Sequence, residues 1–207
     1  MKWRIIDKKS AILPKSGSYG DWKPQLAQEA QYQCVYCCIH ESNFGGFRNF
    51  HVEHYRPKSK FPTLENAYNN LFYSCAICNA FKGNDWPVDI DDGDFSQAGY
   101  PDPSQVDYSW ILKVDYFSGF VTSDIISGKY VIERLYLNRP HLIGLRALTD
   151  LIRRFEEMIA EFSVLMEKGV PDSEVRSVIG VLQQIAILMI KLNKARPYAV
   201  DQIRKQG

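Results

Sequence analysis

His51-Val-Glu-His-Tyr-Arg-Pro-Lys58 is enclosed by two cysteine pairs, Cys34-Val-Tyr-Cys37 before it and Cys75-Ala-Ile-Cys78 after it. Each C-x-x-C pair presents two thiolates from one tight turn, and two pairs about 40 residues apart can close a tetrahedral zinc site. We therefore predict a structural Zn²⁺ with the ligands Cys34, Cys37, Cys75 and Cys78. Four thiolates leave no coordination position open for water, so this ion would hold the polar segment between the pairs together. The neighbouring Cys38 could replace Cys37 as a ligand.

The composition is that of a soluble globular protein. Of 207 residues, 45% are hydrophobic and 24% charged, and the net charge of +1 requires any nucleic-acid-binding surface to be local. Five cysteines in a chain of this size suit a metal in a reducing cytosol better than a disulfide scaffold. The N-terminus has no apolar signal-peptide segment, and the apolar run Val178–Leu192 is interrupted and too short to span a bilayer. We expect a cytoplasmic protein without a membrane partner.

Residues 1–82 are expected to form an α+β core around the cysteine pairs. A short helix over about residues 21–30 would lead into Cys34. Phe50–His54 is predicted to be a strand that Pro57 ends, with Val52 and His54 on one face and His51 and Glu53 on the other. Residues 66–81 are expected to form a turn, a cysteine knuckle and the start of a helix.

Residues 83–107 contain seven Asp, three Pro and no Lys or Arg, which predicts a solvated acidic connecting loop. Residues 108–207 are expected to pack as one compact unit with the core. Trp110–Asp115 and Phe120–Ser123 predict a hairpin about Ser118-Gly119, and Lys129–Leu137 a short helix.

Two amphipathic helices are predicted to follow, beginning near Pro140. The first, ended by Gly169 and Pro171, has an apolar stripe at Leu145, Leu148, Ile152, Phe155, Ile159, Phe162 and Met166. The second runs to Pro197, with its stripe at Val175, Val178, Leu182, Ile185, Met189 and Leu192. Two such helices form a C-terminal helical hairpin, expected to pack internally or to dock a partner.

The order Glu53-His54, Asn70, Asn79 and Lys82, interleaved with the cysteine pairs, resembles the HNH endonuclease family over roughly residues 30–85. The resemblance implies a zinc-stapled ββα-metal core with His54 as the general base and Asn70 orienting it through the backbone. It also implies that Glu53 and Asn79 ligate a catalytic cation. Glu replaces the commoner Asp and Asn takes the last position, and both keep oxygen ligands, which favours Mg²⁺ or Mn²⁺.

These residue types suit phosphodiester hydrolysis. Imidazole can deprotonate water near neutral pH, and two protein ligands leave Mg²⁺ with positions for water and phosphate oxygens. Arg56, Lys58 and Lys82 are predicted phosphate contacts, although a solvated charged loop explains the first two about equally well. His51 shares the predicted face of Glu53 and could assist the cation or a phosphate, or could be a surface histidine.

A closer resemblance rests on Val52-Glu-His-Tyr-Arg-Pro-Lys-Ser59, on Cys75-x-x-Cys-Asn79 followed by Lys82-Gly83, and on Leu135-Tyr-Leu-Asn-Arg139. These segments are similar to the PtuB-type HNH nucleases of Septu and retron anti-phage defence systems. The resemblance implies an antiviral DNA endonuclease with an ABC-type ATPase partner, PtuA. Some members act on tRNA, so a ribonuclease remains an alternative. A non-catalytic zinc module that binds nucleic acid or a protein is a third, against which the intact Glu53-His54 pair speaks.

Overall fold

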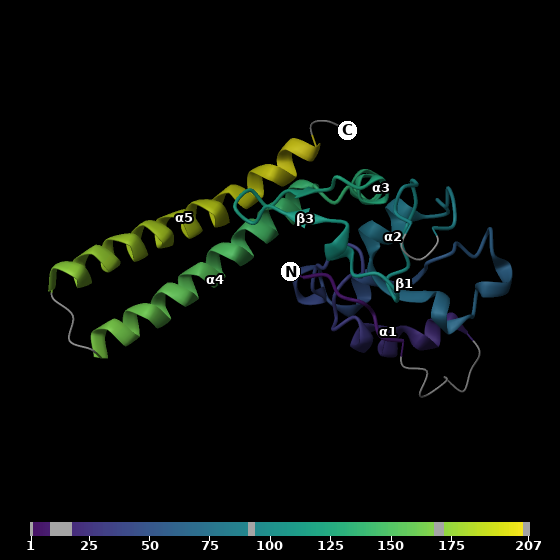
Figure 1. Ribbon diagram of the computed structural model, residues 1–207, viewed down its shortest axis with the longest axis horizontal. Coiled ribbons are helices and arrows are strands. Elements are labelled where there is room, and N and C mark those ends of the chain that lie inside the picture. Colours follow the sequence, from purple (N-terminus) through teal and green to yellow (C-terminus); the bar gives the residue numbers. More distant parts are fainter. Residues whose placement is uncertain (1, 9–17, 91–93, 168–171, 205–207) are drawn as a thin grey trace. The chain divides into compact units, whose positions relative to one another are not determined.

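The computed structural model describes residues 2–8, 18–90, 94–167 and 172–204 (Figure 1). It combines helices with two small sheets, as the predicted α+β class requires. The chain divides into two compact units, one made of Met1–Val114 and Val121–Asn138, the other of Asp115–Phe120 and Arg139–Gly207. The predicted boundaries near residues 82 and 107 therefore do not coincide with the observed division.

The centre of the first unit is a two-stranded antiparallel sheet followed directly by a helix. β1 (Phe50–His54) pairs with β2 (Leu71–Cys75) so that Phe50 lies opposite Cys75 and His54 opposite Leu71. α2 (Ala76–Lys82) starts at the end of β2, and every residue of β2 is buried. The predicted strand at Phe50–His54 is confirmed, and β2 carries large apolar or aromatic side chains on both faces, Leu71 and Tyr73 on one and Phe72 on the other, in keeping with its complete burial.

A helical entry leads to the first cysteine pair. The 3₁₀ helix η1 (Tyr19–Trp22) continues into α1 (Lys23–Glu29), which packs against β2 through buried Leu26 and Ala27. Gln31 and Tyr32 then take positive φ angles, which end the helix and turn the chain. The short 3₁₀ helices η2 (Glu41–Asn43) and η3 (Phe47–Asn49) lead on to β1.

Residues 55–70 form the loop between β1 and β2. It contains the 3₁₀ helices η4 (Pro62–Leu64) and η5 (Tyr68–Asn70). The Tyr55 N–H donates to the carbonyl of Asn70 at 2.9 Å, which closes the loop directly beyond the last strand pair.

The described part of residues 83–107 is not a solvated connection, contrary to the prediction. Trp86 and Tyr100 are buried and stack with their ring centroids 6.1 Å apart. Asp85 accepts a hydrogen bond from Tyr100 at 2.7 Å and pairs with Arg134 at 3.0 Å. Asp94, Asp102 and Asp107 accept backbone N–H groups two residues further on. Three of the acidic residues therefore close turns in a segment whose Trp86 and Tyr100 belong to the core.

A hairpin and a helix complete the first unit. After η6 (Tyr108–Trp110), β3 (Lys113–Val114) pairs with β4 (Val121–Thr122), a shorter ladder than predicted. α3 (Ile126–Arg134) begins three residues before the predicted Lys129. Gly128 is required there, because a Cβ atom would lie 2.5 Å from the Ile111 carbonyl oxygen.

The second unit is a pair of long helices, which confirms the predicted C-terminal helical hairpin. α4 (Pro140–Glu167) and α5 (Asp172–Arg204) pack side by side (Figure 1). α5 continues through Pro197, where an end was predicted, whereas Gly169 and Pro171 lie outside the described residues. Several apolar side chains on the two helices are exposed, namely Ile152, Ile159, Val164, Ile179, Val181, Ile187, Leu188 and Ile190.

One segment of α5, Ser173–Ile190, has a mean hydropathy of 1.4 over 18 residues and contains no buried side chain. By length and composition alone it is sufficient to cross a membrane, which corrects the prediction that the apolar run here is too short. Core helices of soluble proteins share these two properties, so the segment is weak evidence for a membrane span.

Candidate functional site

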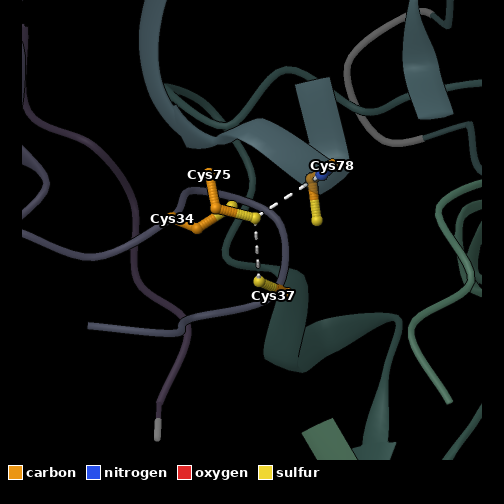
Figure 2. Close-up of side chains that lie close together, drawn as sticks. All are labelled: Cys34, Cys37, Cys75 and Cys78. Atoms are coloured by element: carbon orange, nitrogen blue, oxygen red, sulfur yellow. Dashed lines mark hydrogen bonds between the residues drawn. The ribbon is translucent and has the colours of Figure 1, made fainter. Parts of the chain in front are cut away.

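Four buried cysteines come together as the sequence predicts. The Sγ atoms of Cys34, Cys37, Cys75 and Cys78 all lie within 4.8 Å of one another (Figure 2). The Sγ atoms of Cys37 and Cys75 are 3.8 Å apart. Four thiolates at about 2.3 Å from a tetrahedral zinc would be about 3.8 Å apart. The cluster could therefore hold a metal ion such as zinc.

Local backbone geometry builds the cluster from two tight turns. The Cys38 N–H donates to the Cys34 carbonyl at 2.9 Å and closes the first turn. Cys75 ends β2 and caps α2, where its Sγ accepts from the Cys78 N–H at 3.5 Å. Cys38 is buried with a positive φ of 58° but is not part of the cluster. Cys37 rather than Cys38 is thus the fourth member.

The thiols of the cluster influence one another's ionisation. Burial opposes ionisation of Cys34, but hydrogen bonds with the other three thiols hold its pKa below the ordinary value. The hydrogen bond with Cys34 raises the pKa of Cys75, and burial raises the pKa of Cys78. One thiolate forms readily and makes the next harder to form, so a divalent cation would supply the charge that four thiolates need.

Glu53 and Lys82 form a buried ion pair. Their relative exposures are 2% and 0%, and the Lys82 Nζ lies 2.7 Å from the Glu53 Oε1. The same oxygen accepts a hydrogen bond from the Tyr36 hydroxyl at 3.2 Å. Burial raises the pKa of Glu53 to about 7, and the Lys82 charge opposes this rise. The predicted phosphate contact of Lys82 is incompatible with this position, because its ammonium lies in the interior.

His54 ends β1 and is half-buried. Its Nε2 lies 2.9 Å from the Glu65 carbonyl oxygen, and the Tyr19 ring meets the imidazole edge-on at 4.8 Å. With the proton on Nε2, the ring would donate a hydrogen bond to this carbonyl oxygen, and Nδ1 would be left as the acceptor. Burial lowers the pKa of His54 below 6.5. The ring is therefore a neutral, partly accessible base at neutral pH.

Asn70 holds the β1–β2 loop together. Its Oδ1 accepts from the Arg56 N–H at 2.8 Å, and its Nδ2 donates to the carbonyls of Arg56 at 3.0 Å and Leu64 at 3.2 Å. Leu64 precedes Glu65, whose carbonyl meets the His54 ring. Asn70 is thus linked, through the backbone of Leu64 and Glu65, to the carbonyl that contacts the His54 ring, as its predicted orienting role requires.

Removing the Asn70 side chain should destabilise this loop. Asn70→Ala would leave the partly buried Arg56 N–H and two carbonyls without the side chain that binds them, and we expect the free energy of unfolding to fall by about 3 kcal/mol. Urea denaturation measures this. The matched control is Asn84→Ala, an exposed asparagine, with an expected change below about 0.5 kcal/mol. An equal effect at the two positions would contradict the role of Asn70.

The other predicted residues lie nearer the surface. Asn79 is half-buried on α2, one turn before Lys82 and on the same side of the helix. Arg56 pairs with Asp89 at 2.9 Å, and Lys58 pairs with Glu65 at 3.0 Å, with all four side chains substantially exposed. His51 is exposed on β1.

Three contributors to the site were missed from the sequence. Glu65 contacts His54 through its backbone carbonyl, and because every residue has one, the residue type does not predict this contact. Tyr36 and Tyr19 approach from separate segments, and only the fold brings them to Glu53 and His54.

Comparisons of the chain with protein-family models, curated proteins and solved structures found no match.

Proposed function

We propose that the chain is a metal-dependent HNH-type endonuclease in which His54 is the general base. The observation that carries this proposal is the environment of His54. The imidazole ends the first strand of a β-hairpin that leads directly into α2, and a backbone carbonyl holds its Nε2. Such a ring is oriented and neutral, and its Nδ1 can accept a proton from water.

The residues of the chain would act as follows. His54 takes a proton from the attacking water, while Glu65 and Asn70 hold the ring and its loop in place. Arg56 and Lys58 are exposed and could contact a phosphate. To do so, Arg56 would release Asp89 and Lys58 would release Glu65. A bound Mg²⁺ or Mn²⁺ would supply charge stabilisation at the phosphate and the leaving oxygen. The half-buried Asn79 fits such a cation, whereas the enclosed Glu53 does not.

The cysteine cluster fits a structural zinc, because it offers four converging thiols and no further group. We propose that this zinc fixes the start of α2 against the turn before β1. DNA is the proposed substrate, and the resemblance to PtuB-type nucleases suggests a role in anti-phage defence, with an ATPase partner in the cytoplasm.

A cleavage assay distinguishes the substrates. The purified protein, supplied with Mg²⁺ or Mn²⁺, is incubated with plasmid, single-stranded DNA and total tRNA in one pool. Chelator-sensitive cutting of DNA supports the proposal, and cutting of tRNA alone would establish the ribonuclease alternative.

The pH dependence of cleavage should reflect the lowered pKa of His54. Only the unprotonated imidazole accepts a proton, so the rate rises as pH passes upward through its pKa. Burial lowers that pKa from 6.5 and moves the rise to lower pH. Initial rates are measured between about pH 5 and about pH 8 at fixed Mg²⁺. The rate at pH 6.5 should already exceed half of the plateau rate reached at high pH. A midpoint above about pH 7 would contradict this assignment.

The burial of Glu53 favours a second candidate, a zinc module that binds nucleic acid without cutting it. A carboxylate occupied by Lys82 is not available to a cation. Retention of nucleic acid by the zinc-bound protein, with no cleavage in Mg²⁺ or Mn²⁺, would select this alternative.

A further inference from the structure

We infer that Glu53 and Lys82 position His54 through its backbone, and that Glu53 is not a ligand of the catalytic cation. This inference rests on the proposed nuclease function and assigns different roles to two residues of the same site. It follows from the contacts of the Lys82 ammonium, the enclosure of the Glu53 carboxylate and the link from Lys82 to His54.

The Lys82 ammonium occupies a complete cation-binding cage. It lies 2.7 Å from the Glu53 Oε1 and donates to the His54 carbonyl at 2.9 Å. The rings of Trp86 and Tyr100 lie beside it, with centroids 5.6 Å and 5.3 Å from Nζ. A carboxylate, a carbonyl and two aromatic faces together compensate a buried positive charge. The Lys82 ammonium thus supplies the positive charge that balances the Glu53 carboxylate.

The Glu53 carboxylate has little room for a second cation. Its side chain is 3% exposed, and both Lys82 and Tyr36 bind its Oε1. Mg²⁺ binds oxygen at about 2.0–2.1 Å and usually retains several waters, which need open space. A second cation at this carboxylate would also lie close to the Lys82 charge in a water-poor interior, where repulsion is strong. Asn79 remains as the predicted protein ligand.

The ion pair reaches the proposed base through the backbone. Lys82 ends α2 and holds the carbonyl of His54, the last residue of β1. The Glu65 carbonyl holds the imidazole of the same residue. The backbone and the ring of His54 are therefore anchored separately. Because small displacements of a catalytic group lower the rate strongly, loss of the first anchor should slow cleavage without changing metal affinity.

The test compares wild type with Glu53→Gln, Lys82→Met and the double variant. Cleavage of the nucleic-acid pool is measured as a function of Mg²⁺ concentration. We expect each single change to lower the maximal rate by about tenfold or more, and the double variant to be no slower than the slower single variant. The half-saturating Mg²⁺ concentration should stay within about twofold of wild type. If Glu53→Gln raised the half-saturating Mg²⁺ concentration by about tenfold or more, the inference would be overturned.

Two further variants separate positioning from folding. Lys82→Arg keeps the positive charge and should recover part of the rate that Lys82→Met loses. Lys113→Met removes a lysine from the exposed pair with Asp124 and should leave the rate unchanged. If Lys82→Arg is folded but no faster than Lys82→Met, the ion pair does not position His54.

A readout independent of cleavage keeps this inference separate from the nuclease proposal. Nitrogen NMR of the His54 ring reports its tautomer, and wild type should show the proton on Nε2. Glu53→Gln and Lys82→Met should show a mixture of tautomers or a displaced ring signal. If wild type cuts nothing, the nuclease proposal fails, but an altered ring signal still supports positioning. An unchanged ring signal in both folded variants overturns it.

Discussion

Cys75→Ser is expected to abolish zinc binding and the cooperative unfolding of the first unit. Cys75 ends β2, caps α2 and places its Sγ between Cys37 and the Cys78 N–H, so one substitution removes the link between the two turns. Structural zinc contributes about 10–16 kcal/mol in small zinc domains, which matches or exceeds the whole stability of a typical domain. Metal analysis of the purified protein and a circular-dichroism melt measure the two effects.

Cys38→Ser is the matched control, because Cys38 is also buried and lies outside the cluster. It should keep one zinc per chain and lose only about 1 kcal/mol, the cost of a buried hydroxyl in place of a thiol. A Cys75→Ser protein with wild-type melting temperature would contradict a structural metal at the cluster.

His54→Ala should lower the rate of cleavage by a factor of at least ~10² while leaving the protein folded and zinc-bound. The side chain is half-buried, and its described contacts are the Glu65 carbonyl and the Tyr19 ring, so its loss should affect stability little. Initial rates on the nucleic acid that wild type cuts, measured with the melting temperature, separate lost chemistry from lost folding.

His51→Ala tests whether this effect is specific to His54. His51 is an exposed histidine three residues earlier on β1. As a surface residue it should keep the rate within about threefold of wild type. A loss as large as that of His54→Ala would instead support the predicted alternative that His51 assists the cation or a phosphate.

Local rules were sufficient to predict the cysteine cluster and the long helices. Two tight C-x-x-C turns constrain their sulfur atoms whatever surrounds them, and only the choice between Cys37 and Cys38 required the structure. The apolar repeat of residues 145–166 similarly predicts one helix, observed from Pro140 to Glu167. The helix and the geometry within each cysteine turn depend on neighbouring residues, whereas the meeting of the two turns was predicted from the four ligands that one zinc ion takes.

Burial around Glu53 depends on contacts distant in sequence, and the sequence was misleading there. Strand alternation assigned His51 and Glu53 to one face, but His51 is exposed and Glu53 is enclosed by Lys82 and Tyr36. One overlooked signal was present: Lys82 lies four residues after Cys78, on the side of α2 that the cysteine cluster requires to face inward.

The acidic segment shows the same limit. The number of Asp residues suggested solvent, whereas a few aromatic residues determine its burial. Trp86 and Tyr100 are in the core, and several Asp side chains accept backbone hydrogen bonds in turns. Composition averages over a segment, but packing is decided by the residues with the largest apolar surface.

The most direct test of the proposed nuclease function is the cleavage rate of wild type and His54→Ala, side by side, on the mixed pool of DNA and tRNA with Mg²⁺. We expect that wild type cuts one class of nucleic acid, that a chelator stops the cutting, and that the folded His54→Ala protein is slower by a factor of at least ~10². Equal rates for the two proteins would contradict the central role of His54.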